Sequence, residues 1–178
     1  MTAPLERLAD RLDIIEVCTR LHWCVDHRDW DRLDELLAEQ VSFPTPAELL
    51  APGFDGANYV RGRAEIKAAY PVLLGGLITQ HLIAGHQVEI VGDQAVCRAH
   101  AINVHVPEDG QGSVVAHGNE YLFKLRRTGS GWRIYARQTW IRWRSGDESR
   151  YEVDARMRVW AEEIRPENPA VTGSQHEG

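Results

Sequence analysis

The sequence is poor in the features that mark disulfide-stabilised or membrane-spanning proteins. Its 178 residues include three cysteines, an odd number without a C-x-x-C pair, so neither a disulfide framework nor a structural zinc site is expected. No hydrophobic run is long enough for a membrane helix, and the N-terminus lacks a signal-peptide pattern. We therefore expect a reduced, cytoplasmic protein with no membrane partner.

Positive charge is also scarce. Lysine and arginine number 20 against 26 aspartates and glutamates, which gives a net charge of -6. No basic stripe is visible along the chain, so we expect no nucleic-acid partner. Hydrophobic residues make up 43% of the chain, an ordinary share for one globular domain with a full-sized core.

Motifs of several reaction classes are missing. The chain has no H-E-x-x-H spacing, and His81 and His86 fall on opposite faces of a strand unless a bulge intervenes, so a metal site is the less favoured interpretation. Gly75 and Gly76 lack the spacing and the lysine of a phosphate-binding loop, and no G-x-S-x-G elbow is present. We expect no metal and no organic cofactor.

Hydrophobic periodicity predicts three helices in the first half of the chain, over residues 4–26, 30–38 and 62–73. Asp29 is placed to cap the second helix. Residues 41–43 read as a short strand before Pro44, and the segment 44–60 reads as an irregular connection of the kind that forms lids or cavity walls. The first helix carries a broad apolar stripe that turns polar only at its end: Leu8, Leu12, Ile14, Ile15, Cys18, Thr19, Leu21, His22, Val25 and Asp26.

The second half of the chain reads as strands. Residues 78–91, 94–106, 114–127 and 131–144 alternate in polarity and are separated by glycine-containing turns, as in hairpins. Helices followed by strands predict an α+β fold, in which a curved antiparallel sheet wraps around the N-terminal helices and leaves a small-molecule pocket. We expect this domain to span residues 1–148. A tail over 149–178 follows, with an amphipathic segment at 151–163 and disorder from 165.

Strand alternation assigns the polar residues to faces. One face of the second strand carries Ala95, Cys97, Ala99, Ala101, Asn103 and His105. His100 lies on the opposite face with Arg98. His117, Asn119 and Tyr121 share a face of the third strand, and Arg137 shares one of the fourth with Arg133 and Tyr135. Several convergent polar side chains favour a functional site over isolated, satisfied residues.

Four segments together resemble a known family. They are Asp26-x-Arg-Asp-Trp-Asp-Arg-Leu33, Thr79–Gly85, Gly131–Ile134 and Ile141–Trp143. The combination is similar to scytalone dehydratases and, more broadly, to the SnoaL-like branch of the nuclear transport factor 2-like superfamily, over about residues 8–145. That superfamily hosts dehydratases, isomerases, cyclases, epoxide hydrolases, dehydrochlorinases and plain binders.

The resemblance implies a cone-shaped α+β barrel, a cystatin-like roll, with an Asp–His pair inside. Asp26 matches the family's aspartate, His81 its first catalytic histidine and His105 its second, which strand parity favours over His100.

The resemblance also implies residues that touch the substrate. Asn119 and Tyr121 fall on the family's serine and asparagine. Val25 and Thr45 stand where scytalone dehydratase has two tyrosines that position a water. The resemblance therefore implies the catalytic base but not scytalone as the substrate. We expect Asn119, Tyr121, Trp140, Phe43 and Val25 to contact substrate, within an apolar wall that includes Leu12, Ile15, Val88, Phe43 and Trp140.

The function expected from this pattern is that of a cofactor-independent dehydratase for a cyclic polyketide- or steroid-like compound. His81, oriented by Asp26, would remove a C–H proton beside a carbonyl, while His105 and Asn119 hold or protonate the departing oxygen.

Other interpretations stay open. The same scaffold could serve an isomerase, a cyclase, an epoxide hydrolase with His22 as a second polar group, or a non-catalytic binding module. Asp26 could instead pair with Arg28 or Arg137. Apolar residues on the outer face, Ile102 and Val104 among them, predict a homo-oligomer, either a dimer or a trimer.

Overall fold

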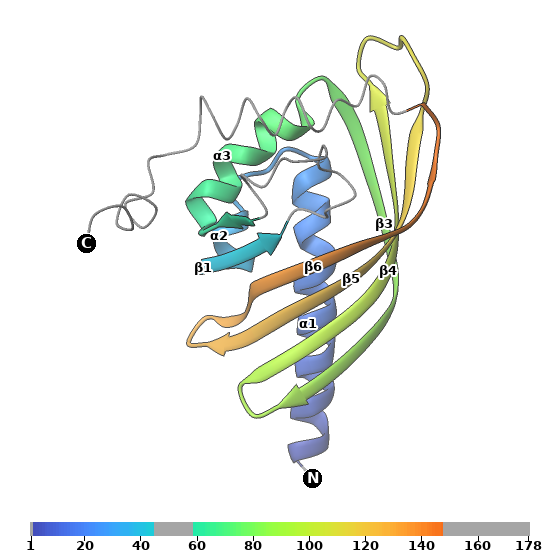
Figure 1. Ribbon diagram of the computed structural model, residues 1–178. Coiled ribbons are helices and arrows are strands. Elements are labelled where there is room, and N and C mark those ends of the chain that lie inside the picture. Colours follow the sequence, from blue (N-terminus) through green and yellow to red (C-terminus); the bar gives the residue numbers. More distant parts are fainter. Residues whose placement is uncertain (1, 45–58, 148–178) are drawn as a thin grey trace, which may run out of the picture.

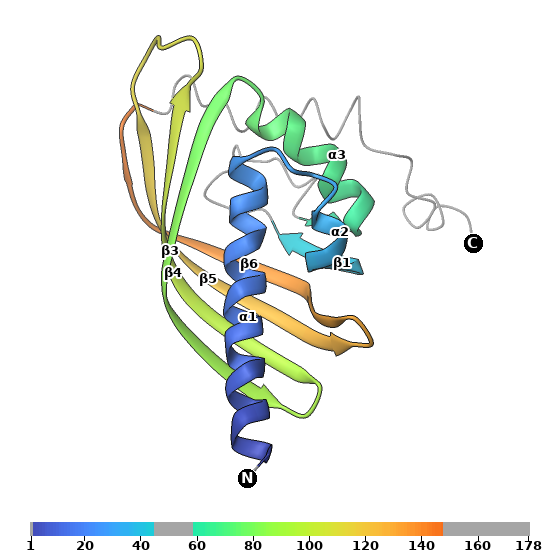
Figure 2. The same ribbon diagram turned by 180° about the vertical axis from the view of Figure 1, so that it is seen from behind.

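A curved six-stranded sheet wraps around one long helix in the computed structural model (Figures 1 and 2). The structure describes residues 2–44 and 59–147. The helices are α1 (Thr2–Asp26), α2 (Leu33–Leu36) and α3 (Arg63–Leu74). The strands are β1 (Leu37–Pro44), β2 (Tyr59–Arg61), β3 (Leu77–Val91), β4 (Gln94–Pro107), β5 (Val115–Thr128) and β6 (Gly131–Ser145).

The strand order across the sheet is β2-β1-β6-β5-β4-β3. Strands β3 to β6 form consecutive antiparallel hairpins, and their ends lie within about one residue of the predicted ones. The prediction of an α+β fold with a curved sheet around the N-terminal helix is confirmed. Strand β1 adds a feature that was not predicted, because it pairs parallel to β6 and closes the sheet over α1.

Helix α1 forms as predicted, but its buried stripe is narrower than expected. Ile14, Cys18, Leu21 and Val25 recur at alternating spacings of four and three and are almost completely buried. Leu8 and Leu12 were placed in the same stripe, and this was wrong: they are 53% and 59% exposed. The reason is that both lie on the side of α1 away from this stripe, whereas Asp10 and Arg11 between them contact β3, β5 and β6. No helix within 2–44 and 59–147 is long and apolar enough to cross a membrane.

The second helix is shorter than predicted. It spans Leu33–Leu36 instead of 30–38, and its N-cap residue is Arg32 rather than Asp29. Leu37 already belongs to β1, where it pairs with Ile134, so sheet formation ends the helix. Helix α3 agrees with the prediction. The predictions for 45–58 and for the tail from 148 lie outside the described residues.

The core lies between α1, β1 and the concave face of the sheet. Its fully buried members include Ile14, Cys18, Cys97, Phe123 and Ile134. Toward the other end of β3, β4 and β5 the same concave face stays buried but turns polar. Thr79, Asn103, His105, His117 and Asn119 are each at most 6% exposed.

Candidate active site

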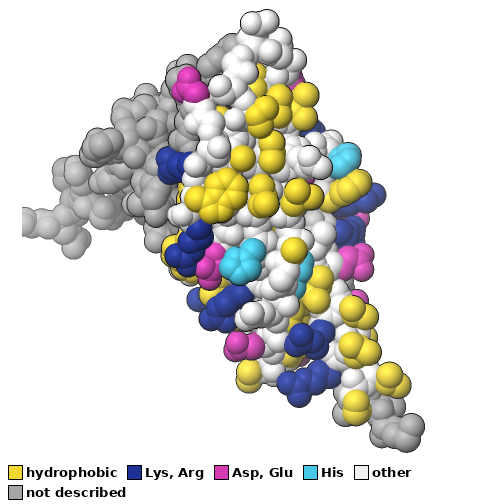
Figure 3. Space-filling view, turned by 90° about the vertical axis from the view of Figure 1, so that its right-hand side faces the viewer, with side chains coloured by type: hydrophobic (Ala, Val, Ile, Leu, Met, Phe, Trp, Pro, Cys, Tyr) yellow, Lys and Arg dark blue, Asp and Glu magenta, His cyan; other side chains and the backbone are white. Residues whose placement is uncertain are grey.

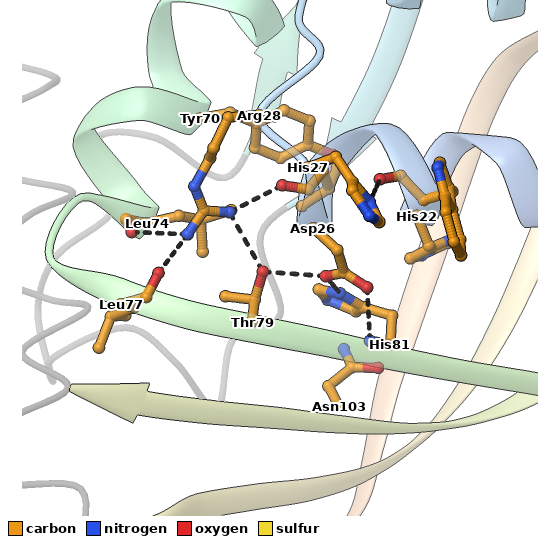
Figure 4. Close-up of polar contacts among 12 residues, drawn as sticks. His22, Asp26, His27, Arg28, Tyr70, Leu74, Leu77, Thr79, His81 and Asn103 are labelled. Carbon is orange, nitrogen blue, oxygen red and sulfur yellow. Dashed lines mark hydrogen bonds and ion pairs between the residues drawn. The ribbon is translucent and has the colours of Figure 1, made fainter. Parts of the chain in front are cut away.

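The centre of the polar region is a direct contact between Asp26 and His81 (Figure 4). Asp26 is the last residue of α1, and His81 lies in β3, which packs against that end of the helix. The Nδ1 atom of His81 is 2.6 Å from Oδ1 of Asp26, and the backbone N–H of His81 donates to Oδ2 at 2.8 Å. This leaves Nε2 as the imidazole atom that does not face the carboxylate. The sequence prediction that these two residues meet agrees with the geometry.

Arg28 and Thr79 hold the carboxylate in place. The hydroxyl of Thr79 donates to Oδ1 of Asp26 at 2.9 Å, and the guanidinium of Arg28 donates to the Thr79 hydroxyl at 3.1 Å. Arg28 also donates to the carbonyl oxygens of Val25, Leu74 and Leu77. Arg28 therefore bonds to Thr79 and to the backbone and not to Asp26, as Figure 4 shows.

Opposing effects set the charge of Asp26. Burial raises the pKa of its carboxyl. This rise is more than offset by groups that lower the pKa: the hydrogen bond and charge of His81, the His81 backbone N–H and the Thr79 hydroxyl. The net pKa lies below the usual value, so Asp26 is an anion at neutral pH. An anion at this position favours the Nδ1–H tautomer of His81 and stabilises an imidazolium.

Three more histidines lie beside this pair. The ring centroids of His22 and His81 are 5.2 Å apart, those of His81 and His105 are 6.0 Å apart, and those of His105 and His117 are 5.5 Å apart. Nδ1 of His22 lies 3.1 Å from the carbonyl oxygen of Cys18, which can only accept, so that nitrogen carries the proton. Burial, followed by the charges of His81 and Arg137, places the pKa of His22 well below its ordinary value. His22 is therefore neutral.

His105 is neutral as well. Burial, and then the charges of His81 and His117, lower its pKa to about 3. A proton stored on His105 at neutral pH, as the prediction allowed, is therefore unfavourable. A neutral imidazole can still donate one hydrogen bond to a polar group in the cavity.

Tyr121 and two asparagines complete the polar lining. Nδ2 of Asn103 donates to the Tyr121 hydroxyl at 2.6 Å, and the ring of Tyr121 lies 4.9 Å from that of His22. Burial raises the pKa of Tyr121, so its phenol stays protonated. Asn103 and Asn119 are 6% and 5% exposed, yet the Oδ1 atom of each has no hydrogen-bond partner. Two buried acceptors without donors favour a site that binds a hydrogen-bond donor.

Arg137 lies on the concave face, and strand alternation placed it wrongly. Lys124 pairs with Ala136 and Leu125 with Ile134, so Tyr135 is an extra residue that forms a β-bulge in β6. The bulge puts Arg137 opposite the buried Phe123, on the concave face and away from its predicted neighbours Arg133 and Tyr135. No pattern within β6 signals this bulge.

The same bulge corrects the prediction for Trp140. This residue pairs with Glu120 and is 37% exposed, on the outer face, so it does not line the cavity. Phe43 belongs to β1 and Val25 to α1, and both side chains are buried, with 4% and 3% exposure. Leu12, predicted in the apolar wall, is exposed, and Thr45 lies outside the described residues.

A metal site finds no support among these side chains. Within the parts of the chain that the structure describes, no three or more His, Cys, Asp or Glu residues are grouped so that they could hold a metal ion. A bulge does occur between His81 and His86, at the register shift between Ala84 and Gln87, but it does not create such a group.

The sequence matches the family model of the SnoaL-like domain over residues 6–138. The chain belongs to this family. No curated protein matches the sequence significantly. The scytalone dehydratase-like, nuclear transport factor 2-like assignment made from the sequence is thus confirmed at the level of family and fold.

Several solved structures match most of the chain. A nuclear transport factor 2-like protein with a cystatin-like fold from Novosphingobium aromaticivorans is 25% identical, with a TM-score of 0.62 and coverage of 79% of this chain and 86% of that one. A proposed scytalone dehydratase from the same organism is 15% identical, with a TM-score of 0.66 and coverage of 79% and 89%. A hexachlorocyclohexane dehydrochlorinase from Novosphingobium barchaimii is 15% identical, with a TM-score of 0.67 and coverage of 83% and 96%. Lyase-type proteins are therefore among the structural neighbours of this SnoaL-like chain, and at 15% identity they show the shared fold.

Proposed function

We propose that the protein is a cofactor-independent lyase that eliminates water from a cyclic small molecule, with His81 as the base. The observation that carries this proposal is the 2.6 Å contact between Nδ1 of His81 and the anionic Asp26. It leaves Nε2 of His81 in a region lined by neutral polar groups. An imidazole oriented in this way is the usual general base at neutral pH.

The proposed elimination needs no proton donor or acceptor other than His81. Nε2 of His81 takes the proton from a carbon beside a carbonyl, and the C–H electrons form the new double bond as the C–O bond on the neighbouring carbon breaks. The imidazolium, stabilised by Asp26, then returns that proton to the departing hydroxide, and water leaves. In this proposal His105 and Asn103, on the strand next to His81, hold the departing oxygen by hydrogen bonds without changing their own charge.

The occupied oxygens of Asp26 argue against the epoxide hydrolase alternative. That reaction needs a carboxylate free to activate water. Both oxygens of Asp26 already accept hydrogen bonds from His81, and Oδ1 also accepts one from Thr79. The carboxylate is arranged to orient an imidazole. A structural neighbour is a hexachlorocyclohexane dehydrochlorinase, and dehydrochlorination is also an elimination, which supports this reaction class.

The proposal can be tested with β-hydroxycyclohexanone as the probe. The wild-type protein should speed its conversion to the enone, followed by absorbance, and should exchange deuterium from solvent into the carbon beside the carbonyl. Loss of one general base typically reduces a rate by about 10²–10⁴-fold, so His81→Ala should lower both rates by that amount. Asp26→Asn should lower them by at least about 10²-fold because it no longer stabilises the imidazolium.

His100→Ala is the matched control. His100 lies on the exposed face of the adjacent strand β4, opposite Glu120, and its removal should leave both rates unchanged. A folded His81→Ala protein with wild-type deuterium exchange would overturn the proposal.

A further inference from the structure

Arg137 brings a cation into the cavity. Its guanidinium carbon lies 4.3 Å from the ring centroid of Phe43 and 5.5 Å from that of Tyr121, and Nη1 donates to the Tyr70 hydroxyl at 3.3 Å. These contacts come from β1, β5 and α3, so the charge sits where three elements meet above the sheet.

The contacts of Arg137 with the described residues leave most of its hydrogen-bonding capacity unused. A guanidinium has five N–H donors in one plane, and the two aromatic faces engage it from outside that plane. One donor bonds Tyr70, while the buried Nε has no hydrogen-bond partner. Among the described residues no carboxylate lies within ion-pair distance of Arg137. Arg127 shows the contrast, since it forms a two-pronged pair with Asp10 at 2.6 and 2.8 Å.

Neighbouring groups point to the same ligand chemistry. Thr139 follows Arg137 on the inward face of β6, and its buried Oγ1 also has no hydrogen-bond partner. A hydroxyl and a guanidinium side by side can both donate to one anionic oxygen pair. A partly buried cation without a neighbouring anion favours the binding of an anionic ligand.

The cation and the proposed base are connected by a short series of rings. His81 contacts His22 at 5.2 Å, His22 contacts Tyr121 at 4.9 Å, and Tyr121 contacts the Arg137 guanidinium at 5.5 Å. The charge of Arg137 also contributes to the low pKa of His22. Arg137 and His81 therefore belong to one continuous cluster of side chains.

We propose that the substrate carries an ionised carboxylate on its ring system and that Arg137 binds this carboxylate through its in-plane N–H groups. The inference rests on the proposed function for what is turned over, because His81 would act at the opposite end of the same molecule. The binding of the carboxylate itself does not require that His81 be the base. Arg137 is thus assigned as the residue that selects acidic ring compounds over neutral ones.

Binding of benzoate and of benzamide, compared by titration calorimetry, tests the selection. These probes share a ring and differ in charge. The wild-type protein should bind benzoate at least tenfold more tightly than benzamide. Arg137→Met, which keeps length and apolar contact, should abolish that preference, and Arg137→Lys should keep part of it, because an ammonium retains the charge but not the planar fork.

Arg142→Gln is the matched control, since Arg142 lies on the same strand and pairs with Glu120 on the surface. It should leave the preference unchanged. Equal affinity for benzoate and benzamide, a preference that survives Arg137→Met in a folded protein, or formate binding as tightly as benzoate would each overturn the inference.

His81→Ala separates this inference from the proposed function. The variant should keep the benzoate preference while losing deuterium exchange. If wild-type protein exchanges neutral ketones through His81 but shows no benzoate preference, the carboxylate inference falls and the lyase proposal stands. If the preference depends on Arg137 but His81→Ala leaves exchange unchanged, the reverse holds.

Discussion

The concave face of the sheet divides along β4 and β5 into an apolar half and a polar half. The apolar half consists of Ala95, Cys97, Phe123 and Leu125, and the polar half of Asn103, His105, His117 and Asn119. Both halves belong to the same continuous antiparallel ladder and both are at least nine-tenths buried. Backbone geometry and burial therefore do not distinguish them.

The difference lies in what the side chains contact. Residues of the apolar half belong to the hydrophobic core with Ile14 and Cys18 of α1, and this burial stabilises the fold. The polar half keeps acceptors such as Oδ1 of Asn119 without partners, which costs stability. Groups kept at such a cost indicate a site where function outweighs stability.

The largest expected effect comes from removing a core side chain in the apolar half. Phe123 is fully buried, so Phe123→Ala should lower the free energy of unfolding by about 3–5 kcal/mol. Asn119→Ala, in the polar half, should cost about 1 kcal/mol or less because the lost acceptor is unpaired. Urea unfolding of the two variants measures the contrast, and equal losses would remove it.

Acid should destabilise the protein through the polar half. His105 has a pKa of about 3 in the folded chain and an ordinary value when unfolded, so below neutral pH the unfolded chain binds a proton that the folded chain does not. Stability should therefore fall as the pH drops through the ordinary histidine range.

His105→Gln removes this contribution and should reduce the slope of stability against pH by about 1.4 kcal/mol per pH unit between about pH 6 and pH 4. Urea midpoints at several pH values measure the slope. An unchanged slope in His105→Gln would contradict the assignment of a neutral buried imidazole.

Arg28 supports the polar half from the side, because it ties the end of α1 to the start of β3. Arg28→Ala should cost about 1–3 kcal/mol, as it leaves partly buried carbonyl oxygens without their donor. It should also slow deuterium exchange, since Thr79 loses the group that holds it toward Asp26.

Arg28→Gly is an informative partner variant. Arg28 has a φ of 58°, in the left-handed region, which glycine adopts freely. Both variants lose the guanidinium, but Arg28→Gly should be about 1–2 kcal/mol more stable than Arg28→Ala. Exchange should be equally slow in both, and a recovery of the rate in the glycine variant would show that backbone strain, not the side chain, acts on the site.

The smallest expected effect concerns the outer face of the sheet, where apolar side chains are exposed behind the polar half of the concave face. Leu82, Ile102 and Trp143 lie in one register row across β3, β4 and β6, with Gly118 of β5 between them, and are 43–55% exposed (Figure 3). We expect this row to contact a second copy of the chain. Trp143→Ser should change the free energy of unfolding of the dilute protein by about 0.5 kcal/mol or less but lower its sedimentation coefficient. An unchanged coefficient would mean that the row is not a contact between copies.

Much of the sheet could be predicted because the signals for it are local. Glycine-containing turns mark where β3 to β6 begin and end. Alternation put Asn103 and His105 on one face of β4, and Asn119 and Tyr121 on one face of β5, and all four side chains are buried in the structure. The contact of Asp26 with His81 was expected from a family resemblance, since 55 residues separate the two and no periodicity connects them.

The parts that could not be predicted depend on tertiary contacts. The short α2 results from Leu37 joining a parallel pair with β6, and the exposure of Leu8 and Leu12 results from which side of α1 faces the sheet. Arg137 and Trp140 exchanged faces because of a bulge that is visible only in the pairing of β6 with β5. Regular alternation predicts the correct face for the residues of β6 up to Ile134, and the bulge at Tyr135 reverses the faces of those that directly follow.

The bulge at Tyr135 makes the pairing register of β6 a determinant of which side chains face α1. If Tyr135 took a regular place in the ladder, the alternation of β6 would turn Ala136, Gln138 and Trp140 inward and leave Arg137 on the outer face. An indole would then replace a guanidinium with no substitution in the sequence. The gain or loss of a single bulge in β6 can therefore change the charge of the concave face as much as a mutation can.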